Sequence, residues 1–229
     1  MLRVQVCILL AASTSTLAVA SLARAETSRS RFVPAGSAYA DSVIQYAPGH
    51  SGGCLPTHPN FIDPKSALGA PNYSGGAYGT GTVSLGGGGL LELFFGGQQF
   101  TNSGDANPDL RFVEVGGFDE AYFVAVRPAP PTTAQQLSAL GLTDNNQDGF
   151  FEIGRASGGN STLDLDRHLN VAVAARSLVF DAVQLMDDDA DHPTCTTTVG
   201  ADIDAVEALD GTVDVAPRSW GSVKLLYRQ

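Results

Sequence analysis

Hydrophobic and polar residues alternate in short runs along the chain, and Gly, Pro and Asn separate one run from the next. The alternation is clearest in LRFVEV (110–115) and YFVAVR (122–127), where it would turn one face inward and the other toward water. The other candidate strands are 41–47, 81–86, 90–95, 150–153, 177–186, 202–209 and 222–227. Segment 132–142 has the pattern of one short helix. The pattern predicts an all-β fold, an antiparallel β-sandwich or barrel with at most one short helix.

The first 25 residues have the pattern of a secretory signal peptide. Arg3 precedes an apolar run, and the small residues Ala23 and Ala25 stand before the expected cleavage position. The alternative is a membrane anchor, but Ser and Thr at 13–16 interrupt a run that would need about 20 apolar residues to span a bilayer. We therefore expect a protein that is secreted or located at the cell surface, with no transmembrane segment after the leader.

The domain organisation that we expect has four parts. They are a signal peptide (1–25), an N-terminal lead-in (26–38), a β-sandwich domain (39–209) and a C-terminal tail or final strand (210–229). The tail contains Trp220, the single tryptophan of the chain, together with several basic residues. Two interpretations of the tail stay open: a final strand packed on the sandwich, or a sorting or docking segment.

The chain is strongly acidic, and its charge limits the partners that it can have. Its 24 acidic and 13 basic residues give a net charge of −11, and loss of the two basic residues in the leader leaves about −13. Nucleic acids and anionic membranes would repel such a surface over a Debye length. We expect no nucleic-acid partner, and the charge favours cations and neutral ligands.

Two cysteines, Cys54 and Cys195, remain after the leader. In an exported chain, such a pair predicts one disulfide bond that closes a long loop. The alternative is a zinc site, which the spacing of the Cys and His residues would also permit. Its candidate ligands would be His50, Cys54, His58, His192 and Cys195. A third alternative is two free thiols. An oxidising compartment favours the disulfide.

Several segments together resemble a family of exported bacterial cell-surface proteins whose domain is similar to the galactose-binding-like jelly roll. They are ADSVIQYAPG, DPKSALGAPN, VSLGGGGLLELFF, PDLRFVEVG, AYFVAV, LDLD and DIDAVEAL, and the resemblance covers most of residues 39–209. It implies a calcium-stabilised jelly-roll sandwich in a fold group that is rich in carbohydrate-binding modules. A fold analogy alone does not establish a ligand.

The segment TDNNQDGFFEIG (143–154) is a candidate calcium loop. Three side chains that carry ligand oxygens stand at alternate positions of this segment, and Gly149 permits a sharp bend. A backbone carbonyl and a later carboxylate could complete the coordination shell of the calcium ion. The expected ligands are Asp144, Asn146, Asp148, Phe150 and Glu152. The loop differs from an EF-hand, because Arg155 replaces the final bidentate Glu and a strand follows instead of a helix. The alternative is a turn in which the side chains accept hydrogen bonds from their own backbone.

The resemblance implies a second calcium site, where the last core strand lies beside the loop after the first strand. The ligands that it implies are Asn60, Asp63, Asp204 and Glu207. Strict alternation through 202–209 would place Glu207 on the same face as Ile203 and Ala205, where an apolar residue is expected. A charged partner for Glu207 is therefore predicted.

Aromatic residues in the loops are candidates for carbohydrate binding, because sugar rings stack on aromatic faces. The candidate ligand-binding residues are Tyr73, Tyr78, Phe100 and Asn102, in a site that we expect near His58 and Asn72. The alternative for these residues is ordinary loop packing.

The sequence favours a monomeric, non-catalytic module that binds carbohydrate or another extracellular polymer, with calcium as a structural ion. A structural cell-envelope protein without a small ligand is the alternative, and a secreted hydrolase is a remote one. GHSGG (49–53) matches a nucleophile elbow around Ser51, with His168 and His192 in a suitable order. However, an elbow must lead into a helix, and the segment after Ser51 contains prolines and no apolar period.

Overall fold

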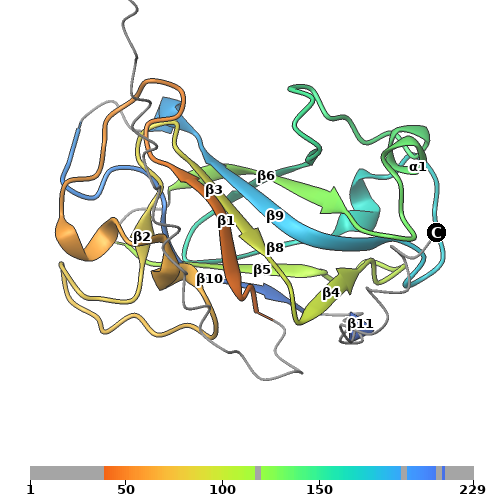
Figure 1. Cartoon of the computed structure of the whole chain (residues 1–229), viewed down its shortest axis with the longest axis horizontal. Helices are drawn as coiled ribbons and strands as arrows, with labels where there is room; N and C mark the ends of the chain where they lie inside the picture. Colours follow the sequence, from red (N-terminus) through yellow and green to blue (C-terminus); the bar gives the residue numbers. More distant parts are fainter. Residues whose placement is uncertain (1–38, 117–119, 192–194, 210–212, 215–229) are drawn as a thin grey trace, which may run out of the picture.

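The computed structural model describes residues 39–116, 120–191, 195–209 and 213–214. In these ranges the chain forms two antiparallel β-sheets and one short α-helix, so the predicted all-β sandwich is confirmed. Figure 1 shows one sheet lying over the other. The expected signal peptide, the lead-in, the strand at 222–227 and Trp220 lie outside the described residues.

The larger sheet is organised around the long strand β9, which is hydrogen-bonded to β3, β4 and β6. Strand β1 pairs with β3, β7 pairs with β6, and β11 pairs with β4, all in antiparallel orientation. The strands are β1 (Ser42–Ala47), β3 (Leu90–Phe94), β4 (Gln98–Thr101), β6 (Ala121–Pro128), β7 (Phe151–Ser157), β9 (Val179–Asp187) and β11 (Val213–Asp214).

The smaller sheet has the order β2-β10-β5-β8 and is also antiparallel. Its strands are β2 (Val83–Ser84), β5 (Leu110–Glu114), β8 (Asn160–Leu163) and β10 (Asp202–Ala208). The short helices between the strands are α1 (Ala134–Ala139) and the 3-10 turns η1 (Pro59–Phe61), η2 (Pro64–Ala67), η3 (Leu165–His168) and η4 (Asp189–Asp191). Among the helices of the described ranges, none has the length and apolar character that a membrane crossing requires.

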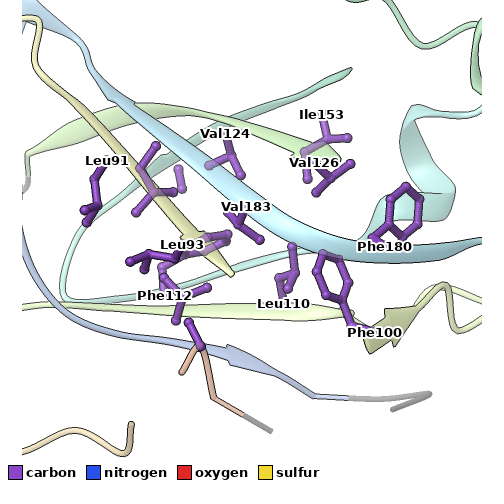
Figure 2. Packing of buried hydrophobic residues seen from close by; sticks show 14 of the residues in the cluster. Leu91, Leu93, Phe100, Leu110, Phe112, Val124, Val126, Ile153, Phe180 and Val183 are labelled. Carbon is purple, nitrogen blue, oxygen red and sulfur yellow. The ribbon is translucent and has the colours of Figure 1, made fainter. Parts of the chain in front are cut away.

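The hydrophobic core lies between the two sheets (Figure 2). Leu91 and Leu93 of β3 and Val183 of β9 contribute from the larger sheet, and Phe112 of β5 contributes from the smaller one. All four side chains are fully buried. Because alternate residues of each strand point inward, the two sheets bury a continuous apolar layer, and this layer holds the connecting loops in fixed positions.

Strand β10 departs from the predicted alternation. Its pairing with β5 shifts register between Ile203 and Ala205, as in a β-bulge. After the bulge, Val206 and Ala208 join Ile203 in the core, and Glu207 is only partly buried. The prediction that Glu207 shares a face with Ile203 is therefore wrong. Glu207 still shares a face with Ala205, but the extra residue places both on the side opposite Ile203.

The predicted disulfide bond is confirmed between Cys54 and Cys195, whose Cα atoms are 5.5 Å apart. It joins the loop after β1 to the loop before β10 across a sequence separation of 141 residues. The zinc alternative is wrong, because both thiols are used in this bond. His192, another candidate zinc ligand, lies outside the described residues.

Candidate functional site

An exposed aromatic pair stands on the loops between β1 and β2. The ring of Tyr78 stacks on the imidazole of His58, with 4.5 Å between ring centroids and 13° between planes. Tyr78 remains 58% exposed. The edge of His58 contacts Phe61, a core-facing residue that is 2% exposed. Tyr78 is thus connected to the core through His58 and Phe61, and much of its ring surface is open to solvent.

The segment that carries His58 is fixed at several points. The backbone N–H groups of Thr57 and His58 both donate to the carbonyl of Thr197, at 3.0 and 3.1 Å. The disulfide joins the same two loops a few residues away. The side-chain amide of Asn60 donates to the carbonyl of Tyr78 at 2.9 Å. These bonds hold the two rings in one arrangement before any ligand arrives, which lowers the entropy cost of binding.

Tyr73 and Asn72 also lie between β1 and β2. Their backbone N–H groups donate to the carboxylate of Asp204, at 3.3 and 2.9 Å. The Tyr73 hydroxyl donates to the carbonyl of Gly76. A Cβ at Gly79 would come within 2.7 Å of the Tyr73 ring, so only glycine permits this close approach next to Tyr78.

Phe100 and Asn102 do not belong to this site, and the prediction that they lie in exposed loops is wrong. Phe100 is in β4, fully buried against Phe95 and Phe180. Asn102 is also fully buried: its amide donates to the Ala174 carbonyl at 3.0 Å and its oxygen accepts from a backbone N–H at 3.0 Å. Both residues are covered because β4 pairs with the start of β9.

The candidate calcium loop at 143–154 is closed by hydrogen bonds of its own. Asp144 accepts from the backbone N–H groups of Asp148 and Gly149, at 3.1 and 3.0 Å. Asp148 accepts from the N–H of Phe150, whose side chain is buried, and from the amide of Asn146, both at 2.9 Å. Glu152 accepts from the N–H of Asn145 at 3.0 Å. These contacts are those of the turn alternative, and calcium binding here stays a prediction.

The ligands implied for the second calcium site have separate partners. Asp63 caps η2 by accepting from the N–H of Lys65 at 3.0 Å, and Asp204 holds the loop at 72–73. Glu207 forms an ion pair with Arg111, so its predicted charged partner is confirmed. Burial raises the pKa of Asp204, although the N–H groups that it accepts from act in the opposite direction. Calcium binding by this set remains a prediction.

A group of three aspartates was not among the predicted sites. Asp109, Asp164 and Asp166 each offer a carboxylate oxygen, and these oxygens lie within 4.8 Å of one another. Asp109 directly precedes β5, and the other two lie at the start of η3. Asp109 is fully buried and Asp164 is 6% exposed. The motifs PDL and LDLD contain all three residues, but nothing in the sequence indicated that β5 and η3 would meet.

Backbone and amide donors hold this aspartate group in place. The two oxygens of Asp109 accept from the N–H groups of Ser103 and Leu165, at 2.6 and 2.7 Å. Asp166 accepts from the N–H of Gly104 at 2.7 Å. Burial raises the pKa of the Asp109 carboxyl to about 6, while the N–H groups of Leu165 and Ser103 lower it. An open hollow of about 280 Å³ lies beside the group, lined by Gly104, Asp105, Asp164, Asp166, Arg167 and Val173.

The nucleophile-elbow pattern does not have the required surroundings. Ser51 lies in the turn after β1, where its N–H donates to the carbonyl of Gly88 at 3.0 Å. An irregular segment follows it, and the next regular element is the 3-10 turn η1 rather than an α-helix. His168 lies close to Gly154, where an added Cβ would come within 3.0 Å of the imidazole ring, and His192 lies outside the described residues.

The fold and these sites define a disulfide-linked β-sandwich with an exposed aromatic pair on its loops and a separate buried group of aspartates. Comparison with models of protein families, with curated proteins and with solved structures found no match.

Proposed function

We propose that this protein is a non-catalytic extracellular binding module that recognises carbohydrate through the exposed ring of Tyr78. The observation that carries the proposal is the stacked pair of His58 and Tyr78, in which Tyr78 is 58% exposed on a well-anchored loop. The resemblance to cell-surface proteins with a galactose-binding-like domain supports the same function. We also propose that the protein is located at the cell surface and that its sandwich is of the jelly-roll type.

The chemistry of the pair suits a sugar ring. The apolar face of a pyranose carries C–H groups that pack on the face of an aromatic ring, and burying both surfaces is favourable. Because His58 stacks on Tyr78, the phenol ring has a fixed plane on which a sugar can lie. Ser74 and Thr80 are exposed on the same loop, where they supply hydroxyl groups for polar contacts.

The net charge narrows the class of carbohydrate. With a net charge of −11, the chain repels uronic-acid or sulfated polymers at low and moderate salt. The proposed ligand is therefore a neutral polysaccharide or oligosaccharide. A divalent cation would act as a structural component rather than as a bridge to an acidic sugar.

A glycan-array screen with the purified protein, followed by affinity electrophoresis in gels that contain the selected polysaccharide, tests this function. Tyr78→Ala is expected to weaken binding at least about tenfold, because a stacked ring contributes roughly 0.5–1.5 kcal/mol in addition to the area that it buries. Phe123→Ala is the matched control, since Phe123 is an aromatic residue on β6 that is 42% exposed. Equal binding by both variants, or no binding of any neutral glycan by the wild type, would contradict the proposal.

A further inference from the structure

The aspartate group of Asp109, Asp164 and Asp166 concentrates negative charge at the end of the sandwich where β5 begins. Three carboxylate oxygens within 4.8 Å of one another repel strongly when two of the side chains are buried. Asn102 donates a neutral amide N–H to Asp166 at 3.0 Å, and Arg167, whose side chain is 72% exposed, forms an ion pair with Asp164. An exposed arginine compensates a buried carboxylate only weakly, since water screens its charge. The group therefore has an excess of negative charge that a cation would neutralise.

One oxygen in this group has no hydrogen bond. Asp164 is 6% exposed, and its Oδ1 accepts from the N–H of Asp166 at 2.9 Å. Its Oδ2 is buried and accepts no hydrogen bond from any described residue. Arg167 Nε lies 3.2 Å from Oδ2 as an ion pair, without the angle of a hydrogen bond. A buried carboxylate oxygen without a donor costs stability, and such an atom indicates a missing ligand.

The surroundings of Asp164 give a ligand access. Asp164 and Asp166 both line the open hollow of about 280 Å³ beside the group. The hollow has room for an ion together with the water molecules that would complete its coordination shell. Gly104, which also lines the hollow, has φ of +78° and directs its N–H to Asp166, which holds that carboxylate in place.

We propose that Asp109, Asp164 and Asp166 bind a hard divalent cation, with Ca²⁺ as the expected ion. The three side chains offer only carboxylate oxygens, which suit Ca²⁺ rather than zinc or copper. Two oxygens that share one Ca²⁺ at about 2.3–2.6 Å are separated by at most about 5 Å, which agrees with the 4.8 Å limit of this group. The site is distinct from both calcium sites expected from the sequence and does not depend on carbohydrate binding.

Calcium titration of the full chain, without any carbohydrate, tests the site. The wild-type protein is expected to bind Ca²⁺ with a Kd on the order of 0.1–1 mM, as extracellular modules do, and its Tm should rise with calcium concentration. Asp164→Asn keeps an acceptor for the N–H of Asp166 but removes the charge, and it should weaken calcium binding by at least about tenfold. Asp148→Asn, in the loop at 143–154, reports on the other candidate calcium site. Asp41→Asn is the control and should retain the wild-type affinity, because Asp41 belongs to none of the candidate sites and its carboxylate accepts from the N–H of Gly97.

The opposite pattern, with calcium binding lost in Asp148→Asn and kept in Asp164→Asn, would overturn the proposal, and so would a wild-type protein that binds no Ca²⁺. If Asp164→Asn does not fold, anomalous diffraction from wild-type crystals soaked in Mn²⁺ or Tb³⁺ decides the question. An anomalous peak among the three carboxylates supports the site. Anomalous peaks that occur only at other positions contradict it. Glycan binding is measured separately, so either proposal can fail without the other.

Discussion

At the scale of single residues, Glu120 combines burial with nearby negative charge. It is partly buried just before β6, close to three other acidic side chains. Burial raises the pKa of its carboxyl to about 9, and the charges of Asp202, Glu114 and Asp187 act in the same direction. The ordinary value is 4.5, so between the two values the folded state binds a proton that the unfolded state releases.

This linkage predicts that the free energy of unfolding falls as pH rises from 5 to 8. The sign follows because the folded state holds more protons in this window than the unfolded state. Glu120→Gln should flatten the dependence, since glutamine cannot ionise. Urea unfolding at several pH values measures the slope, with Asp105→Asn as a control on an exposed loop. An unchanged slope in Glu120→Gln would show that other groups produce it.

Some of the site residues could be located from the sequence, and others could not. The aromatic loop residues, Tyr78 among them, were expected to form a site near His58, and the structure stacks Tyr78 on His58. Phe100 could not be placed, since FGGQQFTN contains no alternating hydrophobic pattern and its burial depends on pairing with β9. Asp109 and Asp164 are more than 50 positions apart, and only the tertiary structure brings their oxygens together.

At the scale of elements, strands with a regular hydrophobic pattern could be predicted and polar strands could not. LRFVEV and YFVAVR became β5 and β6 because one face of each packs in the core. Strand β8 has the mostly polar sequence NSTL. It forms a strand because its backbone is hydrogen-bonded to β5, and not because it buries an apolar face. The bulge in β10 was missed because an extra residue in one strand has no hydrophobic signature.

The central position of β9 predicts a large effect of truncating its core residue Phe180. This ring is fully buried and stacks on Phe100, with 5.4 Å between ring centroids. Phe180→Ala should lower the free energy of unfolding by about 3–5 kcal/mol, because it loses buried apolar area and leaves a cavity. Denaturant unfolding gives the value, and the exposed Phe123→Ala should cost no more than about 1 kcal/mol. Similar costs for the two variants would contradict this placement of β9.

At the scale of the whole molecule, the Cys54–Cys195 bond links loops that are 141 positions apart in sequence. On the chain-entropy model, closing a loop of this length contributes about 5 kcal/mol by restricting the unfolded chain. The double variant Cys54→Ser/Cys195→Ser should therefore unfold at a clearly lower denaturant concentration. Thiol titration of the denatured wild-type protein should detect neither of these two thiols. Detection of both would contradict the disulfide.

The disulfide and the stacked pair of His58 and Tyr78 lie in the loop region for which we propose binding of a neutral carbohydrate. The most direct test is an NMR titration of the ¹⁵N-labelled protein with the neutral oligosaccharide that the glycan array selects. We expect the amide shifts to concentrate in residues 57–61 and 72–80, and Tyr78→Ala should remove them. Shifts concentrated at the hollow around residues 104–106 and 164–173, or no shifts at any oligosaccharide concentration, would contradict it.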